Sequence, residues 1–228
     1  MSPRQPLPRY AGYLFDLDGT LVDTAPDLNA ALNAVLADTG LDTVSEALTR
    51  HWVGHGARVM IERALEHHGQ LSDSAAGLER VAALRDAFVA RYESAIATFS
   101  QPYPGVVETL SELRARGARL AVVTNKITRL TEPLLEALNL TRWFDCIVCG
   151  DTTARPKPAP DPAFHAAAAL GVPIERALFV GDSDTDVNCA RAAGCAVVCV
   201  ADGYNHGIPP ETLGADRVIG SFLELITP

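Results

Sequence analysis

The sequence lacks any uninterrupted apolar stretch long enough to span a bilayer, which takes about 20 residues in a helix. Residues 1–9 hold three prolines and no apolar segment of the kind that a secretory signal carries. We therefore expect a soluble, cytoplasmic protein that has no membrane partner.

Basic residues are too few and too scattered to form a surface for a nucleic-acid backbone. The chain has 19 lysines and arginines against 28 acidic residues, which gives a formal net charge of −9. Nucleic acid is therefore not an expected partner. The same negative field disfavours anionic small molecules, so an enzyme acting on one must place cations locally.

Cysteine is also scarce, with five residues that all lie in the second half of the chain. Cys146 and Cys149 have the C-x-x-C spacing of redox and metal sites. The residues between them, Ile147 and Val148, are β-branched and indicate a buried strand. We expect buried, reduced thiols here rather than a redox or metal site.

Short apolar runs alternate with helical patterns in the second half of the chain. Buried strands are predicted at 119–124, 146–149, 177–180 and 196–200. Helices are predicted at 106–117, 134–138, 163–170 and 186–193. This alternation predicts an α/β fold in which helices cover both faces of a parallel sheet.

Residues 25–100 have a different character. They carry almost no strand signals, no proline after Pro26, and apolar residues at helical spacing. The segment 102–105, Pro-Tyr-Pro-Gly, marks a return to the α/β part. We predict an α/β core formed by residues 1–24 and 101–228, with an all-helical insertion at 25–100.

Asp16 and Asp18 follow directly after the apolar run at 13–15. Alternate residues of an extended chain point the same way, so the two carboxylates should share one site at the strand end. Adjacent carboxylates repel each other, which implies a shared proton or a divalent cation. A helix-loop-helix calcium site does not fit, because its sixth position requires glycine and here is Leu21. An ordinary Asp-Gly surface turn is the structural alternative.

Further polar groups accompany the predicted strands. Thr124 and Asn125 end one strand, Lys157 lies in a proline-rich loop, and Asp182 and Asp186 follow another strand one helical turn apart. Ligands of parallel α/β sheets bind at the carboxyl ends of the strands, so these groups should converge with the first acid pair. Taken singly, Thr-Asn is an ordinary strand-to-helix connection, and a lysine among prolines is often only solvated.

Together these side chains suit the transfer of a phosphoryl group. Hard oxygen ligands for Mg²⁺ come from Asp16, Asp18 and Asp182. Donors and positive charge for phosphate oxygens come from Thr124, Asn125 and Lys157. A carboxylate can attack phosphorus and form an aspartyl-phosphate, so the sequence predicts magnesium-dependent phosphoryl transfer.

The four motifs, in this order, resemble those of the haloacid-dehalogenase-like superfamily of phosphatases. The resemblance implies a Rossmann-like core with an inserted helical cap, in agreement with the pattern above. It also implies that Asp16 is the nucleophile and Asp18 the general acid/base. Phosphate would be held by Thr124, Asn125 and Lys157. Magnesium would be bound by Asp16, the backbone carbonyl of Asp18 and Asp182, with Asp186 in a supporting position.

Further segments, among them 23–27, 52–57 and 203–207, resemble the bacterial phosphoglycolate phosphatases. This resemblance covers nearly the whole chain and implies hydrolysis of 2-phosphoglycolate to glycolate, by a monomer or homodimer. The cap segment Gly54, His55 and Gly56 departs from it, since asparagine is expected in the middle position. We expect this segment to contribute to the choice of substrate.

Other functions remain as alternatives. The same motifs would serve a phosphatase of another small ester, such as a sugar phosphate or nucleotide, or a phosphosugar mutase. A receiver-like signalling domain also collects aspartates, threonine, lysine and Mg²⁺ on a parallel sheet. Such a domain has no use for a large helical insertion or for an acid/base residue at Asp18.

Overall fold

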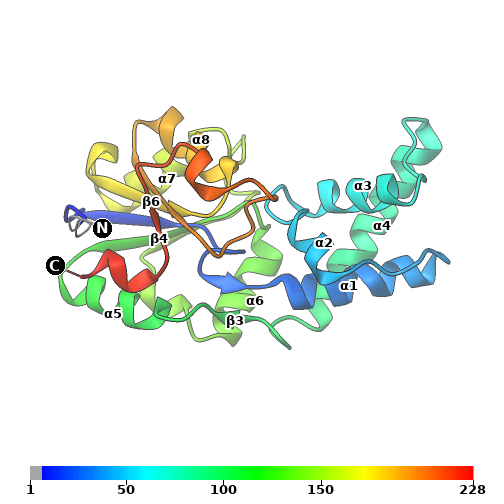
Figure 1. The fold of residues 1–228 in the computed structure, drawn as a ribbon, viewed down its shortest axis with the longest axis horizontal. Coiled ribbons are helices and arrows are strands. Elements are labelled where there is room, and N and C mark those ends of the chain that lie inside the picture. Colours follow the sequence, from blue (N-terminus) through cyan, green and yellow to red (C-terminus); the bar gives the residue numbers. More distant parts are fainter. Residues whose placement is uncertain (1–6, 228) are drawn as a thin grey trace.

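The computed structural model describes residues 7–227, and its larger part is built on a six-stranded sheet (Figure 1). The strand order is β5-β4-β1-β6-β7-β8, and all neighbouring strands are parallel. The strands are β1 (Gly12–Phe15), β4 (Arg119–Val123), β5 (Cys146–Val148), β6 (Ala177–Gly181), β7 (Ala196–Val200) and β8 (Arg217–Ile219). The predicted α/β fold with a Rossmann-like parallel sheet is confirmed.

Helices cover both faces of this sheet. One face packs against α5 (Val106–Ala115) and α6 (Thr128–Ala137), and the other against α7 (Asp161–Leu170) and α8 (Asp184–Ala193). In β1, Phe15 belongs to the first apolar cluster and Leu14 to the second. Successive residues of a strand point to opposite faces, so every residue of β1 is buried.

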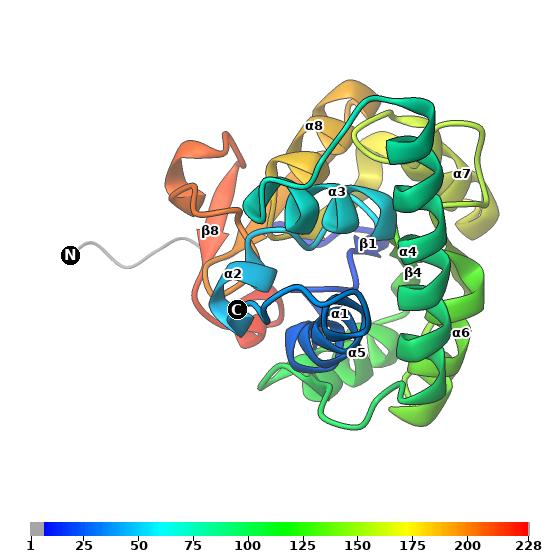
Figure 2. The same cartoon turned by 90° about the vertical axis from the view of Figure 1, so that its right-hand side faces the viewer.

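The inserted helices form a second body with its own apolar core (Figure 1, right). They are α1 (Ala25–Asp38), α2 (Glu46–Arg50), α3 (Ala57–His67) and α4 (Ala75–Ser94). Helix α4 packs against both α1 and α3 (Figure 2). The shared core contains the fully buried side chains of Leu32, Ile61 and Phe88. We refer to this body as the cap.

The chain passes between core and cap through two short strands. β2 (Val22–Asp23) enters the cap and β3 (Gln101–Pro102) leaves it, and the two pair in antiparallel fashion. The buried carboxylate of Asp27 accepts hydrogen bonds from the backbone N–H groups of Phe99 and Ser100. The entering and leaving segments are thus tied together beside the strand pair.

Several elements differ from the sequence-based expectation. Helix α6 begins at Thr128, well before the predicted start, and contains Pro133. Its first turn is stabilised by Asp151, which accepts hydrogen bonds from both the backbone N–H and the hydroxyl of Thr128. Helix α2, strand β8 and the short 3-10 helices were not predicted. The latter are η1 (Thr141–Trp143), η2 (Ile174–Arg176), η3 (Pro210–Thr212) and η4 (Phe222–Leu225).

Among residues 7–227, no helix combines the length and the apolar content that crossing a membrane requires.

Candidate active site

The polar residues predicted to converge lie at the carboxyl ends of three adjacent strands. Asp16 follows β1, which lies between β4 and β6, and Phe15 is in register with Val122 and Val180. Thr124 and Asp182 follow those two neighbouring strands directly. The parallel register therefore delivers residues from three distant parts of the sequence to one edge of the sheet.

Three buried carboxylates meet at this edge. Oxygen atoms of Asp16, Asp182 and Asp186 all lie within 4.8 Å of one another. Helix α8 begins beside these acids, and Asp186 lies in its first turn. The Oδ2 atom of Asp186 accepts hydrogen bonds from the backbone N–H groups of Asp182 and Ser183. The position of Asp186 is thus fixed by the strand-to-helix turn itself.

Lys157 lies between two of these acids. Its Nζ is 2.8 Å from Asp16 Oδ1 and 2.6 Å from Asp186 Oδ1. Burial alone would lower the pKa of Lys157, but the carboxylates of Asp16 and Asp186 outweigh it and raise the pKa above its usual range. The lysine is therefore a permanent cation that partly compensates the crowded acids.

Lys157 does not balance the negative charge of all three acids. Burial raises the pKa of Asp16 to about 7, although Lys157 acts in the opposite direction. Burial, and then the charges of Asp186 and Asp16, raise the pKa of Asp182 well above its usual value. Three crowded carboxylates with one lysine suit a divalent cation that binds hard oxygen ligands. Asp186 is paired with the cation of Lys157 on Oδ1 and accepts two N–H groups on Oδ2. Among the described residues Asp182 has no cationic partner, and it accepts only the hydroxyl of Thr20 and the N–H of Tyr204. Asp16 and Asp182 are therefore the fitting side-chain ligands.

Asp16 is anchored through one oxygen only. Its Oδ1 accepts the backbone N–H of Leu17 at 2.7 Å as well as Lys157. Within residues 7–227, no group donates a hydrogen bond to Oδ2 of Asp16. A carboxylate that is held by one oxygen and free at the other has the form of a positioned nucleophile.

Asp18 makes different contacts from Asp16. Its carboxylate accepts Lys126 Nζ at 2.8 and 3.0 Å and the hydroxyl of Thr24 at 2.6 Å. Both aspartates line one pocket, yet the Asp18 side chain is bonded to Lys126 and is not part of the group of three acids.

Lys126 is a residue of the site to which sequence reasoning gave no role. It is buried, and its Nζ lies 4.6 Å from the ring centroid of Tyr92 in helix α4 of the cap. Burial would lower the pKa of Lys126, but Asp18 and the neighbouring Tyr92 raise it above its usual range. Its position directly after Thr124 and Asn125 was the only local signal.

Asn125 joins the cap to the core. Its Nδ2 donates to the carbonyl oxygens of Gly54 in the cap and Lys157 in the core, at 3.0 Å each. Its Oδ1 is buried and accepts no hydrogen bond from the described residues. Thr124 is also buried, and its hydroxyl accepts the backbone N–H of Lys126.

A cavity of about 440 Å³ opens between core and cap in front of these residues. From the core it is lined by Asp16, Asp18, Thr124, Asn125 and Lys126, and from the cap by residues including Gly54, His55, Gly56 and Arg58. Lys157 and Asp182 are buried behind Asp16 and are not on its wall.

The cap segment of the cavity has a backbone that favours glycine. Gly54 and Gly56 have φ values of 110° and 87°, which side chains larger than hydrogen rarely adopt. His55 between them is exposed, and its ring packs against that of His206 with 4.6 Å between the centroids. The histidine thus contacts both the cavity and a core loop.

Comparison with known proteins identifies the family of the chain. The sequence model of the haloacid dehalogenase-like hydrolases matches residues 13–200. The chain belongs to the haloacid dehalogenase-like hydrolase family and is a hydrolase, which confirms the predicted superfamily.

Several relatives within that family are named phosphoglycolate phosphatase. The chain is 44% identical to the phosphoglycolate phosphatase of Caulobacter vibrioides, over 92% of this chain and 87% of the relative. It superposes with a TM-score of 0.88 on the crystal structure of a predicted phosphoglycolate phosphatase from Haemophilus somnus, at 34% identity over 95% of this chain and 96% of that one. CbbY from Rhodobacter sphaeroides, solved in complex with phosphate, gives a TM-score of 0.78 at 30% identity, over 95% and 96% of the two chains. The predicted resemblance to phosphoglycolate phosphatases is confirmed.

Replacing Lys157 by methionine should cost most stability at alkaline pH. The change leaves Asp16 and Asp186 buried without their cation, so in a metal-free buffer at about pH 8 the free energy of unfolding should fall by about 3 to 5 kcal/mol. Near pH 5 the loss should be smaller. The folded-state pKa of Asp16, about 7, exceeds its unfolded value of about 3.9, so at pH 5 the buried carboxyl is already protonated and needs no cation.

Urea unfolding at both pH values measures this difference. Arg155→Met is the matched control, because Arg155 lies in the same loop and makes an exposed ion pair with Asp161. It should cost less than about 1 kcal/mol at either pH. If Lys157→Met lowered the free energy of unfolding equally at both pH values, the raised pKa of Asp16 would be contradicted.

Proposed function

We propose that this chain is a magnesium-dependent phosphomonoesterase that hydrolyses 2-phosphoglycolate to glycolate and phosphate. The observation that carries the proposal is the state of Asp16, which is anchored through Oδ1, free of donors at Oδ2, and on the wall of the cavity between core and cap. The named relatives support the phosphatase class and this ester.

The residues present fit a magnesium ion. Asp16 and Asp182 would hold it with their carboxylates and Asp18 with its backbone carbonyl, while Asp186 keeps Asp182 and Lys157 in place. When bound, the ion neutralises charge on the phosphoryl oxygens. Hard oxygen donors without imidazole or thiolate are the set that Mg²⁺ prefers.

The chain's own side chains perform the covalent chemistry. Asp16 attacks phosphorus and forms an aspartyl-phosphate as the ester oxygen leaves, and a proton from Asp18 completes the alcohol. Asp18 then takes a proton from the water that cleaves the aspartyl-phosphate. The hydroxyl of Thr124 can donate to a phosphate oxygen, whereas the amide hydrogens of Asn125 already bond the carbonyls of Gly54 and Lys157. Lys157 offsets part of the negative charge of Asp16 and Asp186.

Lys126 connects substrate binding with the hydrogen bonding of Asp18. Its ammonium group donates to both carboxylate oxygens of Asp18. An anionic substrate entering the cavity offers Lys126 a second partner and so weakens its hold on Asp18. We infer that Asp18 is released from Lys126 when the cavity is filled.

The cavity also bears on the choice of substrate. Phosphoglycolate carries a carboxylate as well as a phosphate, and Arg58 of the cap, which is paired with Glu62, is one of the residues that line the cavity. A sugar phosphate or nucleotide phosphatase and a phosphosugar mutase use the same core chemistry, so a substrate screen distinguishes them. The receiver-like alternative does not fit the family to which the chain belongs.

Asp16→Asn tests the nucleophile. The amide keeps the shape of the side chain but removes its attacking charge, so kcat for phosphoglycolate should fall by about three orders of magnitude or more. Phosphate release measures it, with circular dichroism to verify folding. Asp42→Asn, at an exposed position, is the matched control and should retain wild-type kcat. Near wild-type turnover by Asp16→Asn would exclude it as the nucleophile.

Removal of divalent ions tests the cofactor. The wild-type enzyme should lose turnover in excess EDTA and regain it on addition of Mg²⁺, because Asp16 and Asp182 cannot both stay ionised without the cation. The thermal midpoint should also rise with Mg²⁺ in the wild type and rise less in Asp182→Ala. Turnover that is unaffected by EDTA would exclude a metal requirement.

Arg58→Ala tests substrate discrimination by the cap. Losing a charged contact to the substrate carboxylate should lower kcat/KM for phosphoglycolate by about tenfold or more, with little change for an aryl phosphate. Arg63→Ala is the matched control on the same helix, since Arg63 is similarly exposed and paired with a glutamate but does not line the cavity. Equal losses on both esters for Arg58→Ala would place discrimination elsewhere.

A further inference from the structure

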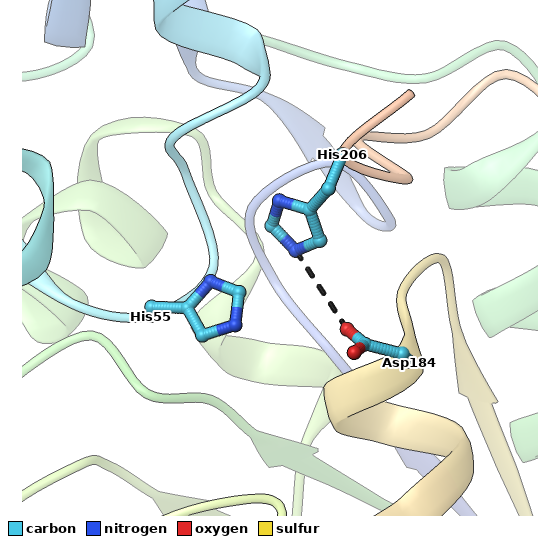
Figure 3. A group of neighbouring side chains, drawn as sticks. All are labelled: His55, Asp184 and His206. Carbon is cyan, nitrogen blue, oxygen red and sulfur yellow. Dashed lines mark ion pairs between the residues drawn. The ribbon is translucent and has the colours of Figure 1, made fainter. Parts of the chain in front are cut away.

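A second group of metal-binding side chains lies where the cap meets the core. His55 belongs to the cap loop before α3, Asp184 is the first residue of α8, and His206 lies in the core loop after β7 (Figure 3). Their ligand atoms all lie within 4.8 Å of one another. None of the three belongs to the acid group of Asp16.

The orientation of His206 is fixed by the cap. Its Nδ1 lies 3.0 Å from the backbone carbonyl oxygen of His51, so Nδ1 carries the proton and donates it. Nε2 is then the atom with a free lone pair. Metal-bound histidines show this arrangement, in which the second ring nitrogen donates to a carbonyl or carboxylate.

That nitrogen has no hydrogen-bond partner among the described residues. Nε2 of His206 is buried and makes no hydrogen bond with any group of the described residues. It points toward Asp184, whose Oδ1 is 4.0 Å away (Figure 3). A buried acceptor left unsatisfied destabilises the fold, and a bound cation would remove this cost.

The other two side chains are also available. The capping box of α8 is made by Ser183 and Asp186, so Asp184 is not needed to cap the helix. The ring of His55 makes no hydrogen bond with any of the described residues and packs beside that of His206.

We propose that His55, Asp184 and His206 bind one divalent ion of the zinc type, with water as the fourth ligand. Two imidazoles and one carboxylate with an open position are a known zinc ligand set, whereas Mg²⁺ prefers oxygen ligands. Ligand atoms in a tetrahedral zinc site are about 3.4 Å apart, given bonds of about 2.1 Å. Binding therefore requires the distance between His206 Nε2 and Asp184 Oδ1, now 4.0 Å, to shorten by about 0.6 Å.

Such an ion would tie the cap to the core. His55 comes from the cap, while Asp184 and His206 come from the core, so occupancy opposes their separation. Because His55 also lines the catalytic cavity, the bound ion would hold that wall of the cavity closed. The site is thus suited to inhibit opening of the cap while leaving the catalytic acids to magnesium.

Calorimetric titration with Zn²⁺ in saturating Mg²⁺ tests the site. The wild-type protein should bind one zinc ion per chain, and His206→Ala and His55→Ala should each raise the Kd by about tenfold or more. His165→Ala is the matched control, because His165 is exposed on α7, and it should leave the Kd unchanged. Zinc should also slow hydrogen exchange in residues 51–56 of the wild type but not of His206→Ala.

Two results would overturn the proposal. One is an unchanged Kd in both histidine variants, and the other is a Kd that responds to Asp182→Ala alone, which would place zinc among the catalytic acids. If His206→Ala does not fold, zinc binding by Asp184→Asn is measured instead, because this variant keeps the hydrogen bond from His206 Nδ1 to the carbonyl oxygen of His51. Unaltered zinc binding by Asp184→Asn would then contradict the site.

Discussion

Lys157 donates to Asp16 and Asp186 in a region where all three side chains are buried. Taking so many charges out of water is costly, and the cost is offset only if each group has several partners. The parallel sheet supplies these partners, because strand ends and helix N-termini present backbone N–H groups at one edge. The turn into α8 exists in its observed form because Asp186 accepts two of those N–H groups.

The hydrogen bonds that the buried acids require also connect them to the cap. Asp182 accepts the hydroxyl of Thr20 and the backbone N–H of Tyr204. The phenol of Tyr204 in turn bonds Asp23 and accepts the N–H of Ala25, where the first cap helix begins. Gly203 must be glycine, since a Cβ there would lie 2.1 Å from that of Asp182. Fixing the acids therefore also fixes the point from which the cap projects.

Local patterns in the sequence were sufficient for five of the six strands of the large sheet, for the helical cap and for the residues at strand ends. Buried parallel strands are continuous apolar runs, and the polar residue that ends each run is visible without knowledge of the fold. The partner of Asp18 was not predictable in this way, because Lys126 is distant in sequence and periodicity carries no information on pairing. Strand β8 was missed for a similar reason: it is three residues long and is defined by its pairing with β7.

Lysine usage carries a signal of its own. The chain contains only two lysines, Lys126 and Lys157, and its other basic residues are all arginines. Both lysines are buried against aspartates, whereas exposed ion pairs such as those of Arg58 and Arg91 use arginine. A compact ammonium group fits between closely spaced carboxylates, where the broad planar guanidinium would force them apart. In a sequence that otherwise uses arginine throughout, each lysine therefore marks a position where a small buried cation is required.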